Sequence, residues 1–435
     1  MAEIRPFRGV RYNQKLVSLD AAICPPYDVI GPEQNDELLA SSEYNFIRLE
    51  AAQSKSGDNE KDNKFTRTRD LLDIWLKKNV LKVENEPALY LHDHYFSFGG
   101  KHYQRRGLIT TVRLEEWDKM VVRPHEGTLA EPKKERLELM RVTRAGISPI
   151  MALYEDPAKR LAALLEQVSR QQPDVNSTGG DEKHRLWVIT GKSLLEKIAE
   201  GLTSEPLYIA DGHHRYESAL AYAREMRAQN PGAGPGADFN FVLMTLIDFD
   251  DPGLLVLPPH RLLRGLSAQT LAGLPSRLEE LFTIKRLPLD ESVWPKVTRL
   301  LEEGEPSQDT VVVVGLEPEQ ALVLKLKDPA AAKLLMPGFH SGRYPHLLVS
   351  IVDRLILESL LGLGSSHEDP NLGYFYDPAQ AVGLVRSGEY QLAFLLSPVK
   401  TTVIKDVADS RVRMPRKATY FYPKLPSGLV FYKMG

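Results

Sequence analysis

The chain has 435 residues, a formal net charge of −3 and a single cysteine, Cys24. This length is enough for two or three domains with apolar cores. Lysine and arginine are scattered among aspartate and glutamate, so we expect no nucleic-acid partner. One cysteine excludes an intrachain disulfide and a cysteine-cluster zinc site. The first residues lack the apolar core of a signal peptide, and no apolar run approaches ~18 residues. We therefore expect a cytoplasmic protein without a membrane span.

Residues 1–99 predict an N-terminal α/β segment. Pro25 and Pro26 force an extended or turned chain, so residues 1–30 are expected to be irregular. Apolar residues at helical spacing predict helices over 32–41 and 65–78. Two strand-rich stretches separated by a Gly-Gly pair predict a hairpin over 88–114, which continues into the next part of the chain.

Two histidines, His92 and His94, lie two residues apart in the first strand of this hairpin. Because side chains alternate along a strand, both should share one face of the sheet. Paired histidines on a strand can hold a metal ion. Since the sequence offers no evident third ligand, we interpret the pair as part of a polar sheet face.

Residues 100–265 predict a second domain, which contains a loop with His125 and Glu126. This pair is either a salt bridge at a helix entry or part of a catalytic site, and the sequence leaves both open. The helix that follows starts near Pro132, so that Lys133 and Arg136 lie on one face about one turn apart. Further along, strands are predicted at 147–154 and 186–189, helices at 158–171 and 192–201, and a loop at 172–183. Residues 240–249 are apolar enough to predict a buried central strand.

The motif Pro206–Tyr216 organises this second domain. An apolar run ends at Asp211, and helical spacing begins at the end of the motif, which predicts a strand, a tight turn at Gly212 and a helix. The first N–H groups of such a helix attract anions, phosphate above all. The alternative is an ordinary strand–helix corner with solvated basic side chains. Three basic residues directly after Asp-Gly favour phosphate binding: His213, His214 and Arg215.

Residues 266–435 predict a C-terminal α/β domain. Helices are expected near 268–281, 291–303, 347–361 and 403–409, and strands at 311–316 and 321–327. The stretch Met414–Lys424 is rich in lysine, arginine, threonine and tyrosine, which indicates docking against another element. A terminal strand held by aromatic residues is the alternative.

Five motifs, in this order, resemble a widespread microbial family known chiefly as a domain of unknown function. They are Pro6–Gly9, Pro25–Ile30, His125–Glu126 with Pro132–Lys133, Asp211–Tyr216 and Met414–Lys424.

The Asp211–Arg215 stretch is also similar to the nucleotide-binding signature of the ParB/sulfiredoxin superfamily. The resemblance implies a mixed-sheet nucleotide-binding domain over 100–265, with additional α/β parts on either side. Within that superfamily, the motif looks most like that of an ADP-dependent free-serine kinase. The superfamily also includes sulfiredoxin, which uses ATP, and chromosome-partition proteins, which bind CTP. This chain departs from sulfiredoxin because its motif has no cysteine. It departs from the partition proteins because we find no basic recognition helix in the sequence.

The resemblance implies a kinase that uses ADP or ATP with Mg²⁺ to phosphorylate a hydroxylated amino acid such as free serine. Phosphoryl transfer needs cations and N–H groups around the phosphoryl group, a metal ion, and a carboxylate near the acceptor hydroxyl. We expect Glu126 to be the base and Asp211 to hold Mg²⁺ directly or through water. Gly212, His213, His214 and Arg215 would bind the nucleotide phosphates. His125, Lys133 and Arg136 would bind phosphate or a substrate carboxylate.

Two other classes of function stay open. A nucleotide-binding switch without chemistry would need the basic turn but not Glu126. A metal-dependent hydrolase would use the carboxylate of Asp211 and four histidines, although Arg215 opposes a bare metal site. These histidines are His213 and His214 with His92 and His94. The sequence does not decide the acceptor or the nucleotide, and it leaves a homodimer open.

Overall fold

The computed structural model describes residues 2–128, 130–177, 182–203, 205–289, 297, 299–301, 310–328, 348–363 and 369–435. Most of the predicted helix 291–303 lies outside the described residues. The chain forms two compact units. Unit 1 comprises 1–124, 128–255 and 423–435, and unit 2 comprises 125–127 and 256–422.

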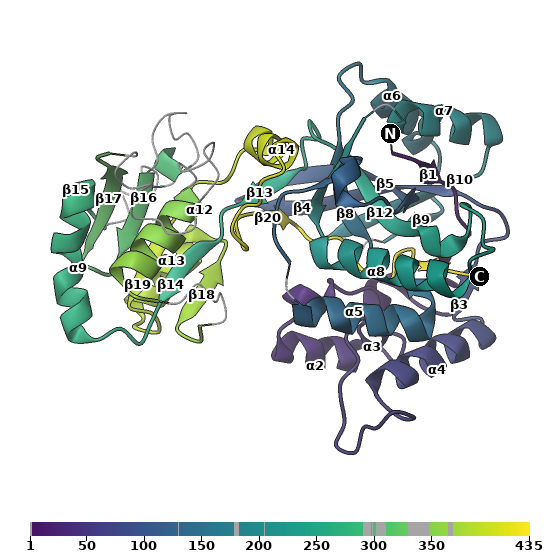
Figure 1. Ribbon diagram of the computed structural model, residues 1–435, viewed down its shortest axis with the longest axis horizontal. Coiled ribbons are helices and arrows are strands. Elements are labelled where there is room, and N and C mark those ends of the chain that lie inside the picture. The colour runs from purple at the N-terminus through teal and green to yellow at the C-terminus, as the bar shows by residue number, and fades with distance from the viewer. Residues whose placement is uncertain are drawn as a thin grey trace. The chain divides into compact units, whose positions relative to one another are not determined.

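Unit 1 is built on a mixed sheet, which confirms the predicted α/β class (Figure 1). Its strands, in spatial order, are β6 (Val122–Pro124), β11 (Leu207–Asp211), β8 (Ile150–Tyr154), β12 (Phe241–Asp248), β5 (Lys101–Arg113), β4 (Leu89–Phe98), β10 (Lys183–Ile189) and β9 (Val175–Asn176), with β1 (Ile4–Arg5) beside β5. β11 runs parallel to β6, and β12 runs parallel to β8, whereas the other pairs are antiparallel. The sheet is continuous through the predicted hairpin of β4 and β5.

The central strand of this sheet is β12, as its apolar sequence predicts. Every residue from Phe241 to Ile247 is buried. β12 pairs with β8 on one side and β5 on the other. Phe241 and Leu243 belong to a core on one face of the sheet, and Val242 and Leu246 belong to a core on the other. The strand therefore has no solvated face, which explains why its sequence is apolar without alternation.

Neighbouring residues of the β4–β5 hairpin enter two different cores. Tyr90 and Ile109 belong to a core formed with the N-terminal segments, α5 and the C-terminal segment. Leu91 and Leu108 belong to a core that α6 and α7 cover. This alternation follows from the two-residue period of a strand. Figure 1 shows α6 and α7 on one side of the sheet and α3, α4 and α5 on the other.

Six helices of unit 1 form where the sequence predicts them. They are α2 (Pro32–Ser41), α4 (Lys64–Lys77), α5 (Ala130–Thr143), α6 (Arg160–Ser169), α7 (Lys192–Leu202) and α8 (His213–Gln229). Two four-residue helices, α1 (Leu19–Ala22) and α3 (Ile47–Glu50), were not predicted. Asn63 caps the N-terminus of α4, because its side chain accepts from the N–H groups of Phe65 and Thr66. Such a cap satisfies N–H groups that have no partner inside the helix.

Two stretches predicted to lack regular structure contain short strands. Within 1–30 lie β1, β2 (Val10–Tyr12) and α1, and β2 pairs with β3 (Leu81–Val83). Within 172–183 lies β9, which pairs with β10. β7 (Ala145–Gly146) likewise pairs with β21 (Tyr432–Lys433). Strands of two or three residues show no detectable hydrophobic period in the sequence. They form because they pair with strands from other parts of the chain.

Unit 2 contains an antiparallel sheet. Its spatial order is β15 (Phe282–Pro288), β17 (Gln320–Leu326), β16 (Thr310–Val314), β19 (Leu392–Leu395), β14 (His260–Leu263) and β18 (Leu372–Phe375). The other elements are β13 (Leu255–Leu257), α9 (Ala268–Leu281), α12 (Leu348–Ser350), α13 (Pro378–Arg386), α14 (Thr401–Asp409) and β20 (Tyr420–Tyr422). The predicted helix 347–361 is a π-helix over Ile351–Leu360.

The described part of the chain holds no helix that is both long and apolar enough to span a membrane.

Candidate functional site

The predicted strand, turn and helix form at Asp211–His213. β11 ends at Asp211, Gly212 has φ = 93°, and α8 begins at His213. A φ of this sign is unfavourable for residues with a Cβ atom. A Cβ atom at Gly212 would also lie 2.9 Å from Nε of Arg215. The N-cap residue of α8 is Gly212, which has no side chain to accept from the first N–H groups of the helix. Such a helix N-terminus favours anions.

Two cations hold the Asp211 carboxylate at this turn. Its Oδ2 accepts from Nη2 of Arg215, and its Oδ1 accepts from Nζ of Lys424. Burial raises the pKa of the Asp211 carboxyl, but Lys424 and Arg215 outweigh burial and hold that pKa well below its ordinary value. Burial lowers the pKa of Lys424, and Asp211 more than offsets it, so the pKa of Lys424 is raised. All three groups are therefore ionised near neutral pH.

Arg215 also fixes the loop before β8. Its Nη1 donates to the carbonyl oxygen of Pro149, and the residue is buried with 7% exposure. Asp211 raises the pKa of Arg215 against the effect of burial. The side chain therefore has a structural role at the turn, beside the phosphate-binding role predicted for it.

The two histidines at the start of α8 differ in exposure. His213 is buried, whereas His214 is half-buried. Tyr216 anchors this turn of the helix, because its hydroxyl donates to the carbonyl of Glu115 at 2.8 Å and accepts from the N–H of Glu115 at 3.0 Å.

The predicted phosphate-binding pair on α5 has two separate partners. Nζ of Lys133 lies 2.8 Å from Oε2 of Glu217, which is on α8. Arg136 instead points toward α3, where Nη1 donates to the carbonyl of Glu50 at 3.0 Å. The guanidinium of Arg136 also lies 3.9 Å from the centre of the Tyr27 ring. Both residues lie in unit 1 with Asp211 and Arg215.

Glu50 is a buried carboxylate that the sequence reasoning missed. Its side chain is 0% exposed. It accepts from the Ser148 hydroxyl at 2.6 Å on both oxygens and from the N–H of Tyr27 at 3.2 Å. Nη1 of Arg136 lies 3.8 Å from its Oε1. A carboxylate buried this completely needs such partners. The nearest signal in the sequence is the Pro25–Ile30 motif, which places Tyr27 beside it.

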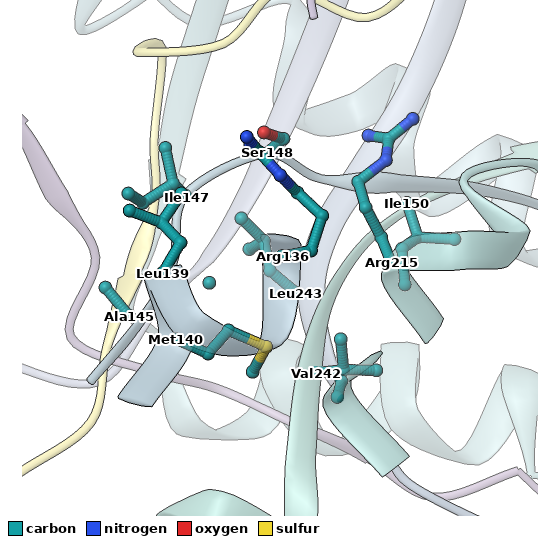
Figure 2. A pocket seen from close by; sticks show the side chains of 12 residues that line it. Arg136, Leu139, Met140, Ala145, Ile147, Ser148, Ile150, Arg215, Val242 and Leu243 are labelled. Atoms are coloured by element: carbon teal, nitrogen blue, oxygen red, sulfur yellow. The ribbon is translucent and has the colours of Figure 1, made fainter. Parts of the chain in front are cut away.

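A small cavity of about 40 Å³ lies between these groups. Arg136, Ser148 and Arg215 supply its polar wall, and apolar residues such as Leu139 and Leu243 supply the rest. Figure 2 shows the guanidinium groups of Arg136 and Arg215 directed to the same side, with Ser148 close to Arg136. Nε of Arg136 is buried and has no hydrogen-bond partner in the described part of the chain. This volume has room for a water molecule.

His125 and Glu126 belong to unit 2. Oε1 of Glu126 accepts from the N–H groups of Ala418 and Thr419, both at 3.3 Å, and from the Thr419 hydroxyl at 3.2 Å. Nε2 of His125 lies 3.0 Å from the same hydroxyl, and the His125 carbonyl accepts from the N–H of Met414 at 2.7 Å. The Met414–Thr419 part of the Met414–Lys424 stretch therefore docks onto the His-Glu loop within unit 2. Its last two residues, Pro423 and Lys424, belong to unit 1 with Asp211.

A family model described as a protein of unknown function (DUF1015) matches residues 4–348. This match covers most of the chain, so the protein belongs to that family. The Met414–Lys424 stretch lies beyond the matched residues.

Several solved structures are similar to this chain at low identity. A free serine kinase in complex with AMP is 15% identical, covers 72% of this chain and 86% of its own, and has a TM-score of 0.35. A conserved hypothetical protein from Pyrococcus furiosus is 13% identical over 74% of this chain and 93% of its own, with a TM-score of 0.33. SbnI from Staphylococcus aureus, truncated at its C-terminus, is 9% identical over 73% and 84%, with a TM-score of 0.33. No curated protein matches the chain.

Proposed function

We propose that unit 1 binds a nucleotide through its phosphates at the N-terminus of α8, and that the protein transfers a phosphoryl group to a hydroxylated amino acid, free serine first among them. The observation that carries the proposal is the turn at Gly212. It opens a helix of 17 residues whose N-cap is a glycine, and two cations, Arg215 and Lys424, lie beside it. The resemblance of Asp211–Arg215 to a nucleotide-binding signature supports the same assignment.

A phosphate at this turn would accept hydrogen bonds from the first N–H groups of α8, and the neighbouring cationic side chains would attract its negative charge. His214 is the half-buried basic residue of the motif and is proposed as a direct ligand. Gly212 lets the main chain approach the ligand closely. Arg215 and Lys424 are proposed to act mainly by charge, because Asp211 already accepts from both. Lys133 would contribute from α5, although Glu217 competes for it.

Mg²⁺ is proposed to be held mainly by the nucleotide phosphates. Each Asp211 oxygen already accepts from a cation, so a metal ion bound directly would be repelled by Arg215 and Lys424. A carboxylate oxygen keeps a second lone pair, which allows a contact through water. The Asp211 carboxylate therefore does not suit direct metal binding, and we assign no catalytic step to a metal ion held by it.

Glu126 is proposed as the base that takes the proton from the acceptor hydroxyl while the phosphorus–oxygen bond to the nucleotide breaks. His125 is proposed to bind phosphate or the carboxylate of the amino acid. Both assignments rest on residue type and on the order of the motifs in the sequence. A nucleotide-binding switch is the second candidate function, because the hydrogen bonds from Ala418 and Thr419 to Glu126 also suit a purely structural role.

Thermal-shift titration with ADP, ATP and CTP, each with and without Mg²⁺, tests binding, and mass spectrometry of serine incubated with the stabilising nucleotide tests transfer. We expect Arg215→Ala to weaken nucleotide affinity by ten- to a hundredfold, because it removes a positive charge beside the phosphates and leaves Asp211 less neutralised, and the loss of a charge-assisted interaction amounts to about 1.5–3 kcal/mol. Since Arg215 is buried, His214→Ala provides a second variant that leaves the Asp211 ion pairs in place. Arg227→Ala, at the other end of α8, is the matched control. Absence of binding to every nucleotide would contradict the proposal.

A further inference from the structure

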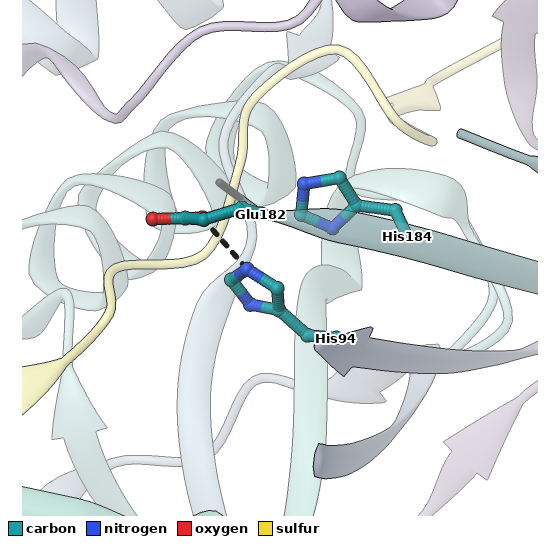
Figure 3. Close-up of side chains that lie close together, drawn as sticks. All are labelled: His94, Glu182 and His184. Atoms are coloured by element: carbon teal, nitrogen blue, oxygen red, sulfur yellow. Dashed lines mark hydrogen bonds and ion pairs between the residues drawn. The ribbon is translucent and has the colours of Figure 1, made fainter. Parts of the chain in front are cut away.

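One face of the unit 1 sheet brings together four polar side chains from three neighbouring chain segments. His94 on β4 pairs directly with His184 on β10 and with Arg105 on β5. Glu182 precedes β10. Nε2 of His94 lies 2.7 Å from Oε2 of Glu182. Figure 3 shows the two imidazole rings and the carboxylate turned toward one another.

The geometry points to a binding site for a divalent transition-metal ion of the zinc class, with His94, Glu182 and His184 as ligands. One potential ligand atom from each of these residues lies within 4.8 Å of the other two. Two imidazoles and one carboxylate form a donor set that suits Zn²⁺ and its neighbours better than Mg²⁺ or Ca²⁺. Three protein ligands also leave a fourth position open.

The three proposed ligands differ in their access to solvent. His94 and His184 are buried in the sheet. The carboxylate provides the route for the ion, since the Glu182 side chain is 43% exposed whereas the His94 side chain is 1% exposed.

His92 orients one of the ligands. Its Nε2 lies 3.1 Å from Nδ1 of His184. If Nδ1 of His184 donates this hydrogen bond, the lone pair of His184 is on Nε2, which is the atom that remains for the metal. A metal-bound histidine commonly donates its other ring N–H in this way. The third ligand that the sequence did not reveal is supplied by β10, which lies beside β4 in the sheet.

Arg105 opposes the binding of a metal ion at His94. Its Nη2 lies 3.2 Å from Nδ1 of His94. A guanidinium only donates, so Nδ1 accepts and the ring proton is on Nε2, facing Glu182. An ion at Nε2 moves this proton to Nδ1, which breaks the hydrogen bond from Arg105, and the buried guanidinium also repels the ion. We therefore expect Arg105→Gln to bind the metal more tightly, because a glutamine oxygen can accept from the Nδ1–H of a metal-bound His94.

The experiment is calorimetric titration of the chelator-treated full chain with Zn²⁺, supported by the visible absorption of Co²⁺ as a spectroscopic probe. We expect one equivalent of Zn²⁺ to bind with micromolar or tighter affinity. His184→Ala and Glu182→Gln should each weaken binding about tenfold or more, and Arg105→Gln should strengthen it about tenfold. His102→Gln is the matched control, because His102 is an exposed histidine on β5 whose partner is Ser97.

Several results would overturn the inference. One is a wild type that binds neither Zn²⁺ nor Co²⁺. Another is a His102→Gln variant that loses as much affinity as His184→Ala, which would place the ion elsewhere. A third is an Arg105→Gln variant that binds more weakly although it remains folded. Thermal denaturation identifies variants that fail to fold, and Glu182→Gln keeps the test decisive because its half-exposed side chain can change without disturbing the core.

Discussion

Lys424 and Asp211 are 213 residues apart in the sequence, and their side chains form an ion pair in the interior of unit 1. The Asp211 carboxylate also accepts from Arg215, which is the third residue of α8. The C-terminal segment therefore completes the candidate phosphate-binding turn. A terminal segment with this role should be essential for the stability of the turn.

We expect Lys424→Met to destabilise unit 1 by about 3 kcal/mol. Removing one partner of a buried ion pair leaves charge without compensation, and such changes cost about 3–5 kcal/mol. Because Arg215 still pairs with Asp211 in this variant, we expect a loss of stability at the lower end of this range. Lys192→Met is the control, because its side chain is 91% exposed and its ion pair with Glu196 is weak at 4.0 Å. Denaturant unfolding measures both variants, and equal losses would contradict a stabilising role for Lys424.

Gly212→Ala should destabilise the turn by roughly 2 kcal/mol or more. The φ of 93° is unfavourable for alanine. The new Cβ atom would also meet the Arg215 side chain and move it away from Asp211. Gly232→Ala is the matched control in the loop after α8, where a Cβ atom has no neighbour within 4 Å. Thermal denaturation should separate the two variants, and a Gly212→Ala protein as stable as the control would show that the turn tolerates a side chain.

Acid should destabilise unit 2 through His260. Burial, followed by the charge of Arg261, lowers the pKa of His260 to about 3, and its Nδ1 accepts from the N–H of Leu396 at 3.1 Å. The unfolded chain, with a histidine pKa near 6.5, binds more protons than the folded chain between those values. The stabilisation is therefore complete above about pH 6.5 and is lost as the pH falls, at about 1.4 kcal/mol per pH unit.

The variant His260→Asn tests this pH dependence. Its amide oxygen can still accept from the N–H of Leu396, but the side chain does not titrate. We expect the free energy of unfolding of the wild type to fall more steeply between about pH 6.5 and pH 5 than that of the variant. Parallel pH profiles of the two proteins would show that His260 titrates normally in the folded state.

Local patterns predicted most elements of the fold, because helices and long strands carry their period in the sequence. The turn at Gly212 was predicted from the switch between the two periods. The partners of the site residues could not be predicted in this way. Lys424 for Asp211, Ser148 for Glu50 and His184 for His94 all depend on strand register and on contacts between distant segments, which leave no local signal.

The last prediction separates a kinase from a nucleotide switch, and it concerns Glu126. A positioned base commonly contributes ~10²–10⁴-fold to the rate. Glu126→Gln removes the charge and keeps an oxygen that can accept from Ala418 and Thr419, which contact Oε1 in the wild type. We therefore expect the variant to fold and to bind nucleotide with unchanged affinity, but to lose phosphoryl transfer to serine by at least a hundredfold.

Mass spectrometry of serine and of the nucleotide measures this transfer in the wild type and in the variant. Glu131→Gln is the matched control, because Glu131 is an exposed carboxylate at the start of α5 and should leave the rate unchanged. If the Glu126→Gln protein transfers as fast as the control, Glu126 has only its structural contacts with the 414–419 stretch. If the wild type binds nucleotide but phosphorylates no amino acid or polyol, the nucleotide-binding switch becomes the better description, because binding at α8 requires no base.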